Sequence, residues 1–306
     1  MDDHLCLLER CELCPRRCRV NRLGGQTGYC GVPDRILIAY YGRHYGEEPP
    51  ISGDMGSGNI FFSSCNLRCI YCQNYQISHT ITGREFSIEE LAGIFLELER
   101  QGCHNINLVS PIPYIPMIIP AIEKARSKGL KLPFVYNTNA YENVETIRLL
   151  EGFIDIYLPD FKYWNKNIAK RLSDVGDYPE HAQAAILEMK AQVGDLVVKK
   201  GIAEKGLLLR HLVLPNNLAG SRQILAWVLK ELGRDTYLSL MSQYYPLHNA
   251  SQYPMINRRI KDREYDELID FLITNGFENV FIQEPESAEE FIPDFRLRDP
   301  FSAITK

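Results

Sequence analysis

Three closely spaced cysteines are the residues of this sequence with the clearest chemical potential. Cys65, Cys69 and Cys72 form a C-x3-C-x2-C motif that directly follows an apolar run at Ile60–Phe62. Thiolates on one short loop can ligate three irons of a [4Fe–4S] cluster, whereas complete ligation by the protein takes four. The motif therefore indicates an iron–sulfur site with one iron left open to a small molecule.

Two other interpretations of the same motif have to be weighed. A structural zinc site prefers four closed ligands, so it would need a fourth from Cys103, His79 or a more distant residue. The cysteines could also be small buried hydrophobic residues. Their close spacing on a predicted loop disfavours that interpretation, because clustered cysteines in a reducing compartment more often bind metal or react.

A second group of cysteines lies near the N-terminus. Cys11, Cys14, Cys18 and Cys30 form the pattern C-x2-C-x3-C-x11-C. Four thiolates suit a tetrahedral zinc ion or a second [4Fe–4S] cluster. The spacing slightly favours zinc, because it lacks the run typical of two-cluster ferredoxins. The segment has little core of its own, so a metal is expected to stabilise it.

Alternating strands and helices are predicted to position these cysteines. The expected strands are Ile60–Phe62, Ile106–Val109, Phe134–Tyr136, Ile154–Leu158, Leu207–Leu214 and Tyr237–Met241. The expected helices are Ser87–Arg100, Met117–Ser127, Val144–Leu150, Asn165–Leu172, Glu180–Gln192 and Ser221–Leu232. Ser87 and Glu90 form a capping box at the start of the clearest helix. Six such units predict an α/β fold with parallel strands, a barrel or partial barrel, with a doubly wound sheet as the alternative. Functional groups then lie at the carboxyl ends of the strands.

The chain is predicted to have one main domain with an N-terminal extension. Residues 1–50 form a cysteine-rich extension with a strand at Ile36–Tyr41. Residues 51–306 form the main domain, which closes with a helix at Asp262–Thr274 and a strand at Val280–Ile282. No internal repeat and no long linker divides the sequence.

Composition excludes several classes of protein. The chain has 306 residues, of which 45% are hydrophobic and 24% charged, as is typical of a globular protein. A net charge of −5 gives no electrostatic reason to expect a nucleic acid or an anionic membrane as partner. The most apolar stretch, Val109–Ile122, is interrupted by prolines and is too short to span a bilayer. The acidic N-terminus has no apolar signal region, so we expect a cytoplasmic location.

The cysteine motif resembles that of the radical S-adenosylmethionine (SAM) superfamily, in which an aromatic residue, here Tyr71, precedes the last cysteine. The stretches at residues 46–53 and 58–62 are similar to pyruvate formate-lyase activating enzyme–like proteins, in particular the PflX-type branch, which also carries N-terminal cysteines. The resemblance implies a partial (β/α)6 barrel whose open iron binds the amino and carboxylate groups of SAM. Reductive cleavage then yields a 5′-deoxyadenosyl radical that removes a hydrogen atom from the substrate.

The resemblance also suggests which residues contact SAM. Beside Tyr71, these are Ser110, which stands where the family usually has Gly-Gly-Glu, and Asn137 and Asn139 after the third strand. Lys162 follows the fourth strand, as in the activating enzymes. The alternatives are a helix-capping or turn role for the asparagines and a surface position for the lysine.

Charged and polar residues on the last two strands of the barrel could complete the site. Arg210 and His211 point to opposite faces of their strand, and alternation does not say which faces the lumen. An inward Arg210 would suit a carboxylate. Gln243 and Tyr244 could form the mouth of a substrate pocket, and His248 could be a base or a surface residue.

The substrate is open at this point. The resemblance suggests a glycine of a partner protein, and a one-electron reductant such as flavodoxin or ferredoxin. Radical modification or methylation of another peptide or small molecule is an alternative, because a shared fold does not fix the substrate. Two further classes are a non-catalytic iron–sulfur electron-transfer protein and a zinc-binding interaction protein.

Overall fold

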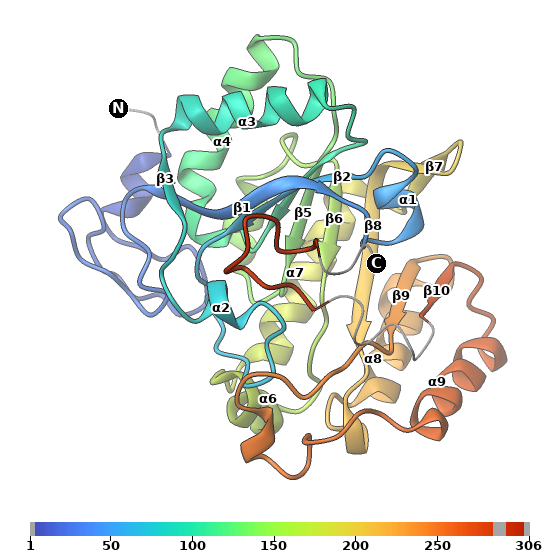
Figure 1. Cartoon of the computed structure of the whole chain (residues 1–306). Helices are drawn as coiled ribbons and strands as arrows, with labels where there is room; N and C mark the ends of the chain where they lie inside the picture. Colours follow the sequence, from blue (N-terminus) through green and yellow to red (C-terminus); the bar gives the residue numbers. More distant parts are fainter. Residues whose placement is uncertain (1–3, 284–291, 303–306) are drawn as a thin grey trace.

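The fold is built on one large, mostly parallel sheet with helices packed outside it (Figure 1). The structure, a computed structural model, describes residues 4–283 and 292–302. The sheet has ten strands. They are β1 (Ile36–His44), β2 (Ser57–Phe62), β3 (Arg84–Phe86), β4 (Ile106–Val109), β5 (Phe134–Thr138), β6 (Ile156–Pro159), β7 (Val197–Lys199), β8 (Ile202–Leu212), β9 (Tyr237–Met241) and β10 (Val280–Ile282).

The helices connect the parallel strands or cap the loops between them. They are α1 (Pro49–Ser52), α2 (Tyr75–Ser78), α3 (Ile88–Arg100), α4 (Ile115–Ser127), α5 (Val144–Arg148), α6 (Lys166–Ser173), α7 (Tyr178–Val193), α8 (Ser221–Trp227) and α9 (Asp262–Thr274). The strand order is β10-β9-β8-β6-β5-β4-β2-β1-β3, and β7 pairs with β8. Strands β2, β4, β5, β6, β8, β9 and β10 run parallel, each to its neighbour.

This topology confirms the predicted fold class. Each of the six predicted strands is followed by a helix and then by the next parallel strand, which is the (β/α)6 pattern. In the described ranges β3 and β10 form the two edges of the sheet and do not pair with each other, so the barrel is partial. The capping box at α3 is also confirmed, because the Ser87 amide donates to Glu90 Oε2 and the Glu90 amide to Ser87 Oγ.

Two features of the sheet go beyond the prediction. The hairpin of β7 and β8 turns at Lys200 and Gly201, which both have positive φ (51° and 83°), the conformation that a tight two-residue hairpin requires. Strand β1 pairs antiparallel with β2 and therefore belongs to the main sheet, although the sequence places it in the N-terminal extension. The division of the chain near residue 50 remains a prediction.

The two neighbours Arg210 and His211 are separated by the alternation of β8. Arg210 faces the barrel interior, whereas His211 is fully buried between the sheet and the helix layer. The His211 Nδ1–H donates to the Phe161 carbonyl at 2.7 Å, and Nε2 accepts from Ser221 Oγ at 2.8 Å. This pattern needs a neutral imidazole, and burial lowers the pKa of His211 to about 4.

We predict that His211 makes the fold sensitive to acid. The neutral imidazole stabilises the native state fully above its ordinary pKa of 6.5, and this contribution is lost as pH falls toward 4. It amounts to at most roughly 3 kcal/mol. Urea denaturation across this window should therefore show a shallower loss of stability for His211→Gln than for the wild type. The half-exposed His181 offers a control, since His181→Gln should retain the wild-type profile. If the unfolding free energies of His211→Gln and the wild type fell in parallel with pH, His211 would not be the acid-sensitive group.

Candidate active site

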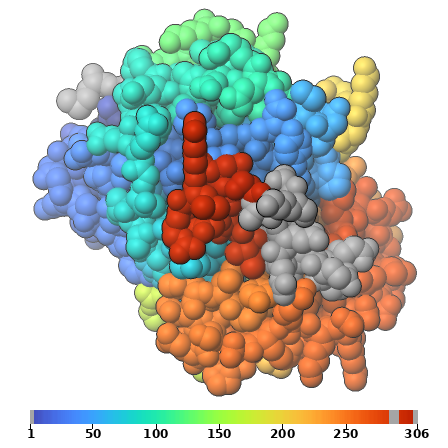
Figure 2. All heavy atoms as spheres, viewed as in Figure 1, coloured from blue at the N-terminus to red at the C-terminus, as the bar shows by residue number. Residues whose placement is uncertain are grey.

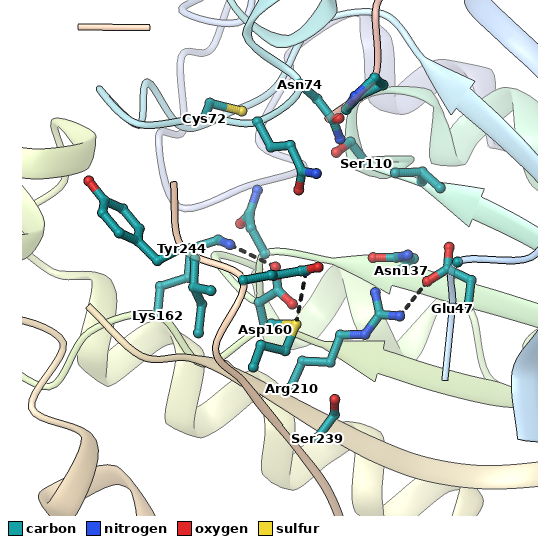
Figure 3. Close-up of a pocket in the computed structure, with 18 of the residues that line it drawn as sticks. Glu47, Cys72, Asn74, Ser110, Asn137, Asp160, Lys162, Arg210, Ser239 and Tyr244 are labelled. Atoms are coloured by element: carbon teal, nitrogen blue, oxygen red, sulfur yellow. Dashed lines mark hydrogen bonds and ion pairs between the residues drawn. The ribbon is translucent and has the colours of Figure 1, made fainter. Parts of the chain in front are cut away.

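The carboxyl ends of the parallel strands open into a cavity of about 970 Å³. Its walls carry polar side chains from successive strands and the loops that follow them, among them Ser110 after β4, Asn137 on β5, Asp160 and Lys162 after β6 and Arg210 on β8 (Figure 3). This is the end of the sheet at which parallel α/β folds bind their ligands.

The cysteine triplet forms one wall of this cavity. Of the described cysteines, only Cys65, Cys69 and Cys72 line it. Burial is the main cause that raises the pKa of Cys65 and of Cys69 to about 11, and the neighbouring thiols act in the same direction. Cys103 lies elsewhere, beside Arg43, so the fourth ligand required by the zinc interpretation does not come from it.

Hydrogen-bond donors surround the three sulfurs. Cys65 Sγ accepts from Asn139 Nδ2 at 3.2 Å and from the Leu67 amide at 3.4 Å. Cys69 Sγ accepts from Ser173 Oγ at 2.9 Å, and Cys72 Sγ lies 3.2 Å from Ser78 Oγ. Donors aimed at sulfur stabilise the thiolate form, which is the form that ligates iron.

The loop that carries the triplet is held from several sides. Ser64 has a left-handed backbone (φ 69°), and its hydroxyl donates to the Cys30 carbonyl of the N-terminal segment. The Ile70 amide donates to the Leu172 carbonyl at 2.9 Å, and the Ile70 carbonyl accepts from the Asn249 amide at 2.9 Å. Contacts with distant segments of the chain therefore fix the loop conformation.

Lys162 lies in the cavity and not on the surface. Its ammonium is 2.7 Å from Asp160 Oδ2, and its side chain is only 17% exposed. Burial alone would lower the pKa of Lys162, but the Asp160 carboxylate and Cys69 outweigh it and raise the pKa above its ordinary value. The lysine is therefore a permanent positive charge beside the cysteines.

A buried ionic cluster closes another part of the cavity. Arg210 forms ion pairs with both Glu47 and Glu48, and its Nε donates to Glu48 Oε1 at 2.8 Å (Figure 3). Glu47 Oε1 also accepts from Asn59 and Asn107 at 2.7 and 2.9 Å. Burial alone would lower the pKa of Arg210, but the two carboxylates outweigh this and raise it. Arg210 thus faces the barrel interior, which is one of the two orientations that the sequence left open. The carboxylates that it binds belong to the protein itself.

The remaining predicted contact residues are all at the cavity. Asn137 and Asn139 line it, and the Ser110 amide donates to the Asn137 carbonyl at 3.0 Å. Ser110 has a left-handed backbone (φ 57°), which turns the chain sharply at the end of β4. Tyr71 also lines the cavity, with its hydroxyl 2.5 Å from that of Tyr163.

Residues after β9 form the mouth only in part. Gln243 and Tyr244 line the cavity, as expected. His248 does not line it and stacks on Tyr75, with 4.9 Å between the ring centroids. The structure thus places His248 outside the cavity wall, and a role as a base there receives no support from its position.

The N-terminal cysteines lie near one another against the barrel. Burial is the main cause that raises the pKa of Cys14 to about 12, and Cys30 and Cys11 act in the same direction, as Cys18 does on Cys30. The described cysteines form no disulfide. In the ranges that the structure describes, no three His, Cys, Asp or Glu side chains gather closely enough for one metal ion.

Comparisons with known proteins agree with this geometry. The family model of the radical SAM superfamily matches residues 59–201. Two proteins of Methanocaldococcus jannaschii, the uncharacterized MJ0674 and MJ0808, are 30% and 26% identical to the chain. These alignments cover 86% and 80% of this chain and 74% and 73% of the relatives. The chain belongs to the radical SAM superfamily.

Solved structures show the same fold at low sequence identity. Streptococcus suis SuiB bound to precursor peptide SuiA has a TM-score of 0.51 and 12% identity over 79% of this chain. HydG, a maturase of the [FeFe]-hydrogenase, has a TM-score of 0.51 and 16% identity over 74% of this chain. The match spans about half of each of those chains, 52% in both cases. These likenesses support the radical SAM fold alone.

Membership of the radical SAM superfamily implies enzyme catalysis with a [4Fe–4S] cluster and SAM. The residues present fit these groups in type and placement, because three thiols face a cavity that also holds a buried ammonium, although as the structure describes them the sulfurs do not lie close enough together to share one metal ion. The assignment to the PflX-type branch stays a prediction. None of the described helices is both long and apolar enough to cross a membrane.

Sequence reasoning missed three carboxylates of the site. Glu47, Glu48 and Asp160 line the cavity, and each pairs with a buried cation. The sequence did contain a signal for such carboxylates, namely Arg210 within the apolar run of β8. A charged residue there needs a counterion when it is buried. Which carboxylates would serve was not visible, since Glu48 stands 162 positions from Arg210.

We predict that the ionic cluster is essential for stability. Arg210→Ala leaves two buried carboxylates without their counterion, which should cost about 3–5 kcal/mol of unfolding free energy. Removing the two negative charges as well, with Glu47→Gln and Glu48→Gln, should recover part of that loss. The exposed Arg263, paired with Glu267, gives a matched control, because Arg263→Ala should cost no more than about 1 kcal/mol. Urea denaturation measures all of these variants, and equal losses for the two alanine variants would refute the prediction.

Proposed function

We propose that this chain cleaves SAM reductively and removes a hydrogen atom from a glycine of a partner protein. The observation that carries the first part is the cavity wall with three cysteines and no fourth among the described residues. When bound, the cluster and SAM supply the chemistry: one electron splits SAM into methionine and a 5′-deoxyadenosyl radical, which takes the hydrogen atom and leaves a substrate radical.

The chain's own residues bind and orient the cofactors in this proposal. Cys65, Cys69 and Cys72 hold the cluster, and the hydrogen-bond donors around them can stabilise their thiolates once iron is bound. The Lys162 ammonium, held by Asp160, is the charge available to the methionyl carboxylate of SAM. Ser110 stands where the family usually contacts the SAM amino group, and its hydroxyl can accept from an ammonium.

Asn137, Asn139 and Tyr71 complete the proposed SAM site. Asn137 lines the cavity at the end of β5, where its amide can reach the ribose or the carboxylate. Asn139 orients Cys65 directly, and Tyr71 is fixed by Tyr163. Arg210 is already engaged by two glutamates, so we assign it to shaping the cavity, and a contact from it to SAM stays a prediction.

Two observations support the assignment of the substrate to a polypeptide. The sequence resemblance to glycyl-radical activating enzymes favours a glycine of a partner protein. SuiB, which shares the fold, has been solved with a precursor peptide. A one-electron reductant such as flavodoxin or ferredoxin would supply the electron. An electron-transfer protein, the alternative, needs no cavity of this size beside its cluster.

Cleavage of SAM tests the proposed chemistry directly. With dithionite and without oxygen, the reconstituted protein should form 5′-deoxyadenosine, which chromatography with mass detection quantifies. Cys69→Ala should abolish the product. Cys103→Ala, a buried cysteine away from the cavity, serves as the matched control and should retain it. Lys162→Ala should weaken SAM binding about ten- to a hundredfold through loss of one charge-assisted hydrogen bond. A reduced, cluster-loaded protein that yields no 5′-deoxyadenosine would overturn the proposal.

We also propose that Cys11, Cys14, Cys18 and Cys30 hold a separate metal, zinc or a second iron–sulfur cluster. Cys14→Ser should lower the metal content per chain and the melting temperature, because metal binding contributes folding energy in a segment with little core. Elemental analysis for zinc and iron identifies the metal. Cys6→Ser, an exposed cysteine outside the group, is the control. Unchanged metal content and stability in a variant lacking all four thiols would contradict this proposal.

A further inference from the structure

The C-terminal segment, residues 292–302, lies across the mouth of the cavity. Ile292, Pro293 and Phe301 contribute to the cavity lining. Figure 1 shows this segment beside β1 and α2, and Figure 2 shows it as a red ridge on the molecular surface. A substrate entering from this side would meet the segment first.

Aromatic side chains hold the segment in place. Phe295 and Phe301 both pack on Phe61 of β2, with 5.4 Å between ring centroids in each case. Phe301 also packs on His44 of β1 at 4.3 Å and on Tyr40 at 5.8 Å. These residues form a hydrophobic cluster that is separate from the main core. Displacement of the segment would therefore uncover an apolar surface without opening the core.

Gln76 of α2 holds the backbone of the same segment. Its Oε1 accepts from the Phe295 amide at 2.7 Å, and its Nε2 donates to Asp294 Oδ1 at 3.1 Å. The bond to a main-chain amide does not depend on the side chain that follows. A primary amide with one bond to the backbone can thus hold another polypeptide that carries a suitable aromatic residue nearby.

We infer that Tyr40, His44, Phe61 and Gln76, the mouth patch, form a docking surface for a polypeptide turn with an aromatic side chain, and that residues 292–302 occupy it within the same chain. This inference rests on the proposed polypeptide substrate. Three facts carry it: a turn-forming segment of this chain is seated there, its aromatic cluster is separate from the main core, and its neighbouring residues reach the cavity.

The geometry also gives a register for the docked polypeptide. Phe295 bonds to Gln76, while Ile292 and Pro293, three and two positions before it, line the cavity. A partner docked in the same manner presents to the cavity a residue two or three positions before the one held by Gln76. The segment of the chain itself therefore takes the position of a substrate and competes with it.

Peptide binding tests this inference without any cofactor. The probe is a fluorescein-labelled peptide with the sequence of residues 292–302, and fluorescence anisotropy measures its affinity for the full chain. A tethered segment competes at an effective concentration in the millimolar range, so the wild type should bind the peptide weakly. The full-length variant Phe295→Ala/Phe301→Ala releases its own segment and should bind at least tenfold more tightly. Adding Gln76→Ala to that variant should weaken binding again, about five- to tenfold.

Matched controls separate release of the segment from general damage. Phe153→Ala/Phe277→Ala removes two partly buried phenylalanines far from the mouth patch and should bind the probe as weakly as the wild type. A probe with both phenylalanines changed to alanine should not bind the released variant. Circular dichroism checks folding. Hydrogen exchange of the wild type gives a second measurement, in which excess peptide should speed exchange at the Phe295 amide.

The possible results are decisive. Equal affinity of the wild type and the released variant, or no effect of Gln76→Ala, would overturn the inference. The wild type could also form a dimer at high protein concentration, in which two copies exchange residues 292–302. A doubled molecular mass of this origin would assign the mouth patch to a second copy and would also overturn the inference. Because the assay needs no SAM, failure here leaves the cleavage proposal standing, and failure of cleavage leaves the binding result intact.

Discussion

The buried guanidinium of Arg210 sets the arrangement of the whole cavity. It connects β8 to Glu47 and Glu48, which lie just before α1 in the loop between β1 and β2. A charge removed from water must be compensated by ions and hydrogen bonds in fixed geometry, so the loop between β1 and β2 has little freedom to move. That loop in turn places β2, at whose end the cysteine motif begins. The position of the cavity wall that carries the three cysteines therefore depends on an ion pair at the far side of the cavity.

Local patterns in the sequence were sufficient to predict much of the fold. The capping box at Ser87 and the alternation of strands and helices follow from interactions within a few residues, and the structure agrees with them. The cysteine motif was equally visible, because its three ligands lie within one loop. Alternation also required Arg210 and His211 to face opposite sides, although only packing could decide which one faced the lumen.

Features that depend on distant residues were not predictable in the same way. The counterions of Arg210 stand more than 160 positions away, and nothing near β8 identifies them. The seating of Phe301 on Phe61 joins segments about 240 positions apart and has no local signature. The inclusion of β1 in the sheet likewise depends on its pairing with β2. Long-range contacts of this kind are chosen by the complete fold.

The attachment of the cysteine loop has a consequence for how the protein is made in the cell. The loop is held by Cys30, Leu172 and Asn249, and the last of these is synthesised long after Cys72. While the ribosome is still translating, the three thiols are present without the bonds that fix them in the finished fold. The nascent chain therefore passes through a period in which the thiols of the cysteine motif are more accessible than they are in the finished fold.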